Sequence, residues 1–179
     1  NKVSKKFNFN KNNKNIIFYG NINSHINKNA CLNFAKTILP ILNKLSEIKL
    51  RIVGEINTNL KKKFSNMENV EVLGSVNSLD NNIQNAICGI CNVNSATGFQ
   101  NKIFEYMRLG LPSIISKKSF NKLFKKNKNV LVYNSDQDLV FKIMKLKSNK
   151  RVSNSLSKEG IKLARKNSWK NNIQDYNSL

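Results

Sequence analysis

Hydrophobic residues along the chain alternate between two kinds of spacing. Short, continuous apolar runs bounded by Gly or polar residues are typical of strands buried on both faces, whereas apolar residues every three or four positions are typical of amphipathic helices. Short runs rich in apolar residues predict six strands, over residues 16–20, 48–54, 70–74, 86–93, 112–116 and 129–134, of which 16–20 is continuously apolar and closed by Gly20. The wider spacing predicts helices over 29–45, 58–66, 78–86, 136–147, 153–166 and 168–179, and one beginning at Thr97.

Strand and helix alternate with short connections, and this order predicts an α/β fold. A strand that is followed by a helix and another strand forms a parallel sheet with helices on both faces. We therefore expect a doubly wound parallel sheet of about six strands, formed by residues 16–179. Residues 1–15 are polar, lack an initiator Met and are expected to be a linker or frayed lead, so that the chain is interpreted as a piece of a longer protein.

The formal net charge of +21 raises the question of a nucleic-acid or membrane partner. Asn, Lys and Ile are all abundant and share A/T-rich codons, so genome composition alone could enrich the surface in Lys. The lysines are also spread along the chain, which favours a solvated basic surface over a nucleic-acid face. No run approaches the roughly 18 to 20 apolar residues of a membrane span.

Few residues of the chain suit metal binding or nucleophilic catalysis. Cys88 and Cys91 form a C-x-x-C pair inside the strand predicted over 86–93, where residues three apart point to opposite faces, so we expect core thiols. His25 is the only histidine and is expected in a surface loop. Neither G-x-G-x-x-G nor G-x-x-x-x-G-K-[ST] occurs, which disfavours a Rossmann dehydrogenase and a P-loop enzyme. No catalytic residue, metal or cofactor is predicted.

Ligands of doubly wound sheets bind beyond the carboxyl ends of the strands, so residues just after each strand are candidates for a site. Three of these ends carry a glycine, which lets a backbone approach a ligand closely or simply turns the chain. The candidates at these ends are Gly20 and Asn21, Gly54 and Glu55, Gly74 and Ser75, and residues 92–98.

The helix that begins at Thr97 offers a place for an anion. Thr97 and Gln100 have the spacing of a capping box, and the N–H groups of Gly98 and Phe99 lie in the first turn. Free N–H groups at a helix start attract phosphate, and Lys102 adds a full positive charge.

Glu105 follows Lys102 by three residues, on a face expected to point away from the core. It would lie about 12 Å from the cap at about 1.5 Å per residue, deep enough to reach a hydroxyl-bearing ring beyond a diphosphate. The alternative is an i,i+3 ion pair between the two side chains, worth about 0.2 to 0.5 kcal/mol. Helix geometry alone leaves both alternatives open.

The sequence "GFQNKIFEYMRLGLPSIIS" resembles the donor-site helix of GT-B glycosyltransferases of the group 1 type. That family commonly has G-x-x-x-K-x-x-E-x-M-x-x-G-x-P-V-I at this place. The stretches "IIFYGNINSHINKNACLNFAKTILPIL", "LRIVGE", "VEVLGSV" and "SWKNNIQDY" continue the resemblance from Ile16 onward. The positions in register are Gly98, Lys102, Glu105, Met107, Gly110 and Pro112.

The resemblance implies the C-terminal, nucleotide-sugar-binding half of a GT-B fold, which is Rossmann-like. The N-terminal acceptor-binding domain would precede Asn1 and is absent from this chain. Glu105 would hold the ribose of the nucleotide. The pyrophosphate would contact Lys102 and the backbone amides around Gly98, which include Phe99 and Gln100, and Gly20 with Asn21 would border the sugar phosphates.

The same resemblance implies a glycosyltransferase of cell-surface polysaccharide synthesis, inactive as this isolated domain. The donor would be a nucleotide-diphosphate sugar and the acceptor a glycan or a lipid-linked molecule. The expected location is cytoplasmic, with peripheral contact to an anionic membrane. The alternatives are a basic module for nucleic acid or membrane, and half of a sugar-nucleotide epimerase.

Overall fold

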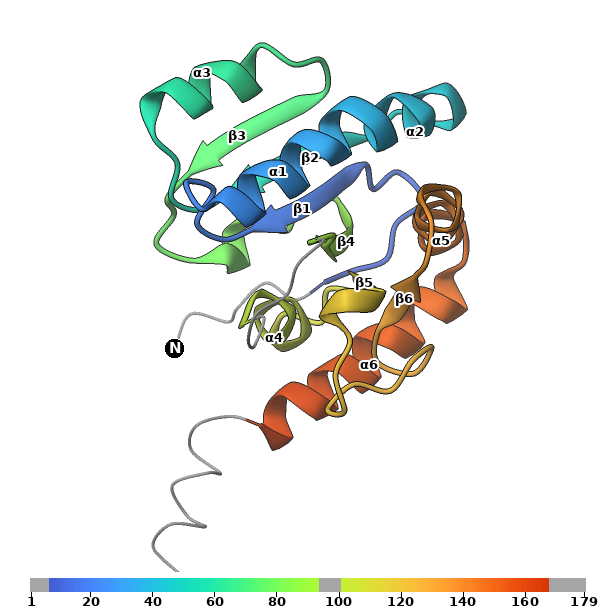
Figure 1. Ribbon diagram of the computed structural model, residues 1–179. Helices are drawn as coiled ribbons and strands as arrows, with labels where there is room; N and C mark the ends of the chain where they lie inside the picture. Colours follow the sequence, from blue (N-terminus) through green and yellow to red (C-terminus); the bar gives the residue numbers. More distant parts are fainter. Residues whose placement is uncertain (1–6, 94–100, 168–179) are drawn as a thin grey trace, which may run out of the picture.

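A computed structural model describes residues 7–93 and 101–167 of the chain (Figure 1). Its six strands are β1 Asn15–Tyr19, β2 Lys49–Val53, β3 Val70–Gly74, β4 Ala86–Cys91, β5 Ser113–Ser116 and β6 Leu131–Tyr133. They form one parallel sheet in the order β3-β2-β1-β4-β5-β6. The predicted α/β class and the six-stranded parallel sheet are confirmed, and β2, β4, β5 and β6 are shorter than the sequence pattern predicts.

Helices cover both faces of the sheet. They are α1 His25–Asn33, α2 Leu39–Leu45, α3 Thr58–Ser65, α4 Asn101–Arg108, α5 Asp136–Ser148 and α6 Lys150–Lys166. Successive residues of a strand point to opposite faces, and the packing of β1 shows both. Ile16 and Phe18 belong to one buried core together with Phe34, whereas Ile17 belongs to a second core with Tyr106.

The helical region after β1 starts earlier than predicted and contains a π turn. Ser24 accepts a hydrogen bond from the N–H of Asn27 at 3.3 Å, and this cap starts α1 at His25. His25 is therefore the first residue of a helix, and the expectation of a loop histidine is wrong. A π turn over Phe34–Ile38 precedes Pro40, which has no N–H to continue the α-helical ladder, so that a new α-helical segment begins at Leu39.

The helix predicted over 78–86 is wrong. Ser78 caps this stretch by accepting from the N–H of Asp80 at 3.2 Å, but only one 3-10 turn follows, over Leu79–Asn82. Asn82 then donates its side-chain amide to the carbonyl of Ser78, and Asn85 adopts a φ of 57°. Asn side chains compete with helical hydrogen bonds and tolerate the left-handed region, so the Asn-rich stretch turns directly into β4.

The chain before β1 is hydrogen-bonded to the domain from Phe7 onward. The N–H of Phe7 donates to the carbonyl of Leu109 at 2.9 Å, and the buried side chain of Asn13 donates to the carbonyl of Ala86 at 2.9 Å. Residues 1–6 of the predicted linker and the helix predicted over 168–179 lie outside the described residues.

The thiols of β4 are part of the core. Cys88 and Cys91 are both fully buried, as the sequence predicts, and burial raises the pKa of both. The described residues contain no group of three His, Cys, Asp or Glu side chains that could hold a metal ion.

Candidate functional site

A pocket lies where the direction of chain progression across the sheet reverses. β1 and β4 are neighbours, but the chain continues from β1 to β2 on one side and from β4 to β5 on the other. Such a switch point leaves a crevice at the carboxyl ends of the strands. A pocket of about 360 Å³ occupies this place, lined by Tyr19, Gly20, Asn21, Gly54, Glu55, Asn101 and Lys102.

Glycines at the ends of β1, β2 and β3 form the floor beside this pocket. The N–H of Gly20 donates to the carbonyl of Val53 at 3.0 Å, and the N–H of Gly54 donates to the carbonyl of Gly74 at 2.7 Å. All three glycines have positive φ, at 146°, 125° and 75°. A Cβ atom on Gly54 would overlap the carbonyl of Gly20, so these two backbones pack closely because Gly54 has no side chain.

Lys102 projects from the first turn of α4 into a largely buried position. Its residue is only 7% exposed, and the ammonium lies 4.3 Å from the centre of the Phe18 ring. The ammonium donates to Oδ1 of Asn27 at 2.6 Å. Burial lowers the pKa of Lys102, because removal from water penalises the charged form.

Asn27 ties this ammonium to the loop after β1. Its Oδ1 accepts from Lys102, while its Nδ2 donates to the backbone carbonyl of Asn21 at 2.8 Å. A Cβ on Gly20 would lie 3.3 Å from Nδ2 of Asn27 and 3.5 Å from Nζ of Lys102. The three residues therefore converge, and the missing side chain of Gly20 keeps space open beside the ammonium.

Glu105 has a different partner from the one considered in the sequence. Its carboxylate is 42% exposed and accepts from Arg108 at 3.2 Å, whereas Lys102 is buried against Asn27. The expectation that Lys102 points away from the core is therefore wrong, and so is the alternative of a Lys102–Glu105 ion pair. Glu105 follows the pocket residue Asn101 by four positions, so it lies on the same face of α4 one turn further along.

Arg108 also connects α4 to the turn before β4. Its guanidinium donates to Asp80 at 2.8 Å as well as to Glu105. The hydrogen bond from Arg108 lowers the pKa of Asp80 and raises that of Arg108 itself. Arg108 thus restrains the exposed Glu105 carboxylate through a second, better-buried carboxylate.

Asn21 and Glu55 form the polar wall opposite α4. The exposed side chain of Asn21 donates to Glu55 at 2.9 Å and accepts from the N–H of Asn23 at 2.9 Å. Asn23 adds a longer hydrogen bond to Glu55 at 3.5 Å. These amides compensate part of the Glu55 charge and join the loops after β1 and β2.

Tyr106 fixes α4 against the sheet. Its hydroxyl accepts from the N–H of Tyr19 at 2.8 Å and lies 3.3 Å from the carbonyls of Ile17 and Ile90. A Cβ on Gly89 would come within 2.5 Å of the Tyr106 ring, so the helix approaches β4 closely only because residue 89 is glycine. This contact sets the depth at which Lys102 enters the pocket.

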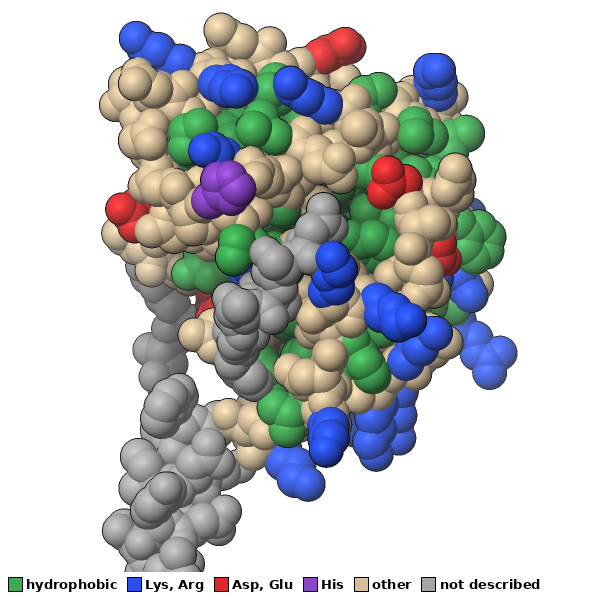
Figure 2. Space-filling view, viewed as in Figure 1, with side chains coloured by type: hydrophobic (Ala, Val, Ile, Leu, Met, Phe, Trp, Pro, Cys, Tyr) green, Lys and Arg blue, Asp and Glu red, His purple; other side chains and the backbone are tan. Residues whose placement is uncertain are grey.

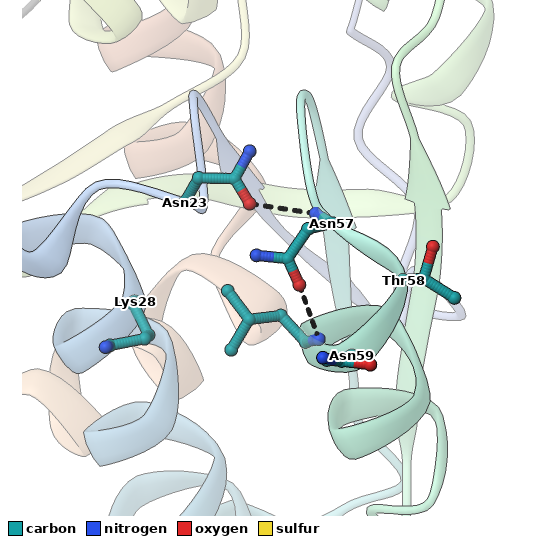
Figure 3. Close-up of a pocket in the computed structure, with 6 residues that line it drawn as sticks. Asn23, Lys28, Asn57, Thr58 and Asn59 are labelled. Atoms are coloured by element: carbon teal, nitrogen blue, oxygen red, sulfur yellow. Dashed lines mark hydrogen bonds between the residues drawn. The ribbon is translucent and has the colours of Figure 1, made fainter.

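A second pocket of about 480 Å³ lies between α1 and the start of α3 (Figure 3). In Figure 3 the Oδ1 of Asn23 accepts from the N–H of Asn57 at 2.8 Å, and Asn57 caps α3 by accepting from the N–H of Leu60 at 2.9 Å. Lys28 comes from α1 on the other side of this pocket. The Asn23–Asn57 bond holds the loop that carries Asn21 at its position.

The structure brings together part of the predicted site. Gly20, Asn21 and Lys102 line one pocket, and Glu105 lies on the adjacent turn of α4. Asn27 was missed, because its link to Lys102 joins residues that are far apart in the sequence. Gly98, Phe99 and Gln100, together with the predicted cap Thr97, lie outside the described residues.

The sequence model of the family described as glycosyl transferases group 1 matches residues 13–149, which include the whole pocket. The chain belongs to this family. A comparison of the sequence with curated proteins gave no significant match.

Solved structures of glycosyltransferases share the fold of this group 1 domain. TarM superposes with a TM-score of 0.75 at 15% identity over 99% of this chain and 37% of TarM. Anabaena HepE, solved in complex with UDP and glucose, superposes with a TM-score of 0.72 at 14% identity, over 93% of this chain and 48% of HepE. The C-terminal domain of the group 1 protein LpcC from Francisella tularensis superposes with a TM-score of 0.66 at 15% identity, over 86% of this chain and 85% of that domain.

The chain therefore spans less than half of TarM and of HepE, but most of the LpcC C-terminal domain. Its sheet is the Rossmann-like half of a GT-B fold. Within residues 7–93 and 101–167, no helix is both long enough and apolar enough to cross a bilayer.

Proposed function

We propose that this group 1 domain binds the nucleotide-diphosphate sugar of a glycosyltransferase. The observation that carries the proposal is the Lys102 ammonium, held by Asn27 at the edge of the switch-point pocket. A buried ammonium whose pKa is lowered by desolvation gains most from an anion that restores its charge. Complexes of Anabaena HepE with UDP and with UDP-glucose support a uridine nucleotide as the first donor to test.

In this proposal the diphosphate lies between Gly20 and Lys102. The backbone at Gly20 leaves room for phosphate oxygens, and Lys102 stabilises the negative charge that grows on the departing diphosphate. The ribose extends along α4 toward Glu105, whose carboxylate accepts hydrogen bonds from its hydroxyls while Arg108 restrains it. Gly98, Phe99 and Gln100, which precede α4 in the sequence, remain proposed contacts of the pyrophosphate.

The proposed reaction transfers the sugar to a glycan or lipid-linked acceptor in cell-surface polysaccharide synthesis, on the cytoplasmic side. The acceptor would be bound by a second domain, which the chain's coverage of less than half of TarM and HepE supports. We therefore expect this chain alone to bind donor without transferring sugar.

Calorimetric titration with UDP, GDP, uridine and inorganic pyrophosphate tests the two ends of the proposed site separately. Lys102→Met keeps an apolar stem over Phe18 and removes the charge, so it should weaken UDP and pyrophosphate about ten- to hundredfold, the value of a charged hydrogen bond. Glu105→Gln should weaken UDP and uridine but leave pyrophosphate unchanged.

Lys36→Met is the matched control, because it removes an exposed lysine of the π turn outside the pocket. It should leave all four affinities unchanged. Absence of nucleoside-diphosphate binding by the folded wild-type chain, or equal affinities in wild type and Lys102→Met, would refute the proposal.

A further inference from the structure

The connection between β5 and β6 contains more lysines than an even distribution along the chain would place there. Six of the twelve residues from 117 to 128 are lysines, and the stretch contains neither Asp nor Glu. We call residues 117–128 the basic segment. All six side chains are exposed: Lys117, Lys118, Lys122, Lys125, Lys126 and Lys128.

Two large apolar side chains are exposed among these lysines. Phe120 is 39% exposed and Leu123 is 44% exposed, three positions apart. An isolated exposed apolar residue is ordinary, but two within a run of lysines form an amphipathic surface. Figure 2 shows Lys and Arg side chains gathered at the lower right, where Figure 1 places β6, α6 and the β5–β6 connection.

The backbone of the basic segment is held by the domain. Phe124 is buried, with its ring centre 5.6 Å from that of Phe104 of α4 and the two rings tilted by 38°. Ser119 is also buried, with its hydroxyl 3.0 Å from that of Ser116. The N–H of Lys125 donates to the side chain of Asn129 at 2.8 Å. The lysines and the two apolar side chains therefore project from a fixed surface.

Acidic neighbours neutralise little of this charge. Glu159 of α6 lies 4.0 Å from Lys128 but also 2.7 Å from Lys162, and Asp138 of α5 is hydrogen-bonded to Lys142. The remaining lysines of the segment keep a positive field directed outward.

We propose that the basic segment binds the surface of an anionic bilayer. Lysines close to an anionic surface are attracted to its headgroups, and Phe120 with Leu123 can enter the boundary between headgroups and acyl chains. Nucleic acid fits less well, because the segment has no Arg for bidentate contacts and exposes a single ring, that of Phe120, on which a base could stack.

The segment begins directly after β5 at the carboxyl edge of the sheet, the same edge that carries Gly20 and the pocket, and it ends near the amino end of the parallel strand β6. β5 is two strands from β1, a separation of roughly 10 Å at about 4.8 Å per strand. Membrane binding through the start of the segment, at Lys117 and Lys118, would therefore place the pocket edge near the bilayer, whether or not the pocket binds a nucleotide.

Co-sedimentation of the 179-residue chain with vesicles tests the proposal. We expect binding to phosphatidylcholine vesicles that contain phosphatidylglycerol, weaker binding at high salt, and little binding to phosphatidylcholine alone. Each lysine near the surface contributes about fivefold in affinity, so Lys117→Glu with Lys118→Glu and Lys122→Glu should lower binding about a hundredfold or more. Phe120→Ser with Leu123→Ser should lower it about tenfold without a change of charge.

The matched control is Lys61→Glu with Lys62→Glu and Lys63→Glu, three exposed lysines of α3. It changes the net charge by the same amount, but in a stretch without an exposed large apolar side chain. It should lower vesicle binding less than about fivefold. Circular dichroism and UDP titration verify folding of each variant, and loss of UDP binding alone would concern only the nucleotide site.

Three results would overturn the proposal. One is equal binding to neutral and anionic vesicles, and another is an equal loss in the two lysine triples. The third is tighter, segment-dependent binding to duplex or single-stranded DNA than to the anionic vesicles, which would assign the segment to nucleic acid.

Discussion

The ammonium of Lys102 donates to Oδ1 of Asn27 at 2.6 Å, although 75 residues separate them in the sequence. The contact joins the start of α4 to α1 across the carboxyl end of β1. It also determines which way the buried charge points, because the Nδ2 of Asn27 is fixed by the carbonyl of Asn21. The position of the charge in the pocket therefore depends on an uncharged side chain.

Replacing this amide should cost both stability and affinity. Asn27→Ala leaves a buried ammonium without its acceptor, so we expect a loss of about 1 to 3 kcal/mol in the free energy of unfolding. Affinity for UDP should fall about tenfold, because Lys102 is no longer aimed. Urea denaturation and calorimetry measure the two effects. Asn29→Ala, an exposed position on the same helix, should change neither, and equal effects at both positions would contradict the assigned role.

Nucleotide affinity should begin to fall at a lower pH than it would if Lys102 had the ordinary pKa of a lysine. Burial lowers the pKa of Lys102, so the ammonium loses its proton as pH rises through that lowered value. Binding of a diphosphate requires the charged form of Lys102. Affinity should therefore decrease as pH rises, already at pH values below the usual pKa range of lysine. The measurement is the difference between wild type and Lys102→Met, since titration of the base itself affects both. Parallel pH profiles in the two proteins would rule out this dependence.

The ion pair between Asp80 and Arg108 should contribute stability that acid removes. The hydrogen bond from Arg108 lowers the folded pKa of Asp80, so its contribution is present above the ordinary Asp pKa and is lost as pH falls through the folded value. Asp80→Asn should therefore be less stable than wild type at neutral pH and approach it in acid. Urea denaturation at several pH values measures the convergence. Glu68→Gln, which removes an exposed carboxylate next to Asn69, is the control. Its free energy of unfolding should depend on pH in the same way as that of wild type.

Two strand-end glycines should differ in their tolerance of a methyl group. Gly54→Ala combines positive φ with overlap on the carbonyl of Gly20 and should cost about 3 kcal/mol or more. Gly74→Ala has positive φ but no atom within 4 Å of the added carbon, so only about 1 to 2 kcal/mol of backbone strain is expected. Thermal or urea unfolding orders the two, and a cost at Gly74 equal to that at Gly54 would show that crowding at Gly20 is not the cause.

Local pattern was sufficient for the sheet and for much of the helix assignment. Apolar-rich runs correspond to all six strands. β1, β4 and β5 are buried on both faces and carry no charged side chain, whereas β2 and β3 include the half-buried, paired side chains of Arg51 and Glu71. The pattern failed over 78–86, where an amphipathic spacing competed with Asn side chains that bond to nearby backbone. The start of α1 was missed because its cap at Ser24 lies in a polar stretch that contributes little hydrophobic signal.

The sequence by itself determined the sheet, the glycines that end its first three strands and the residues that resemble a nucleotide-sugar helix. Only the tertiary structure decided the partners of the charges on that helix. Helical spacing would allow Lys102 and Glu105 to pair with one another. Because Tyr106 packs against Gly89, however, α4 lies close to β4 and Lys102 is buried next to Asn27. Glu105 remains exposed and binds Arg108 instead. Desolvation and long-range contacts select among local pairings that are nearly equal in energy, and neither can be read from spacing along a helix.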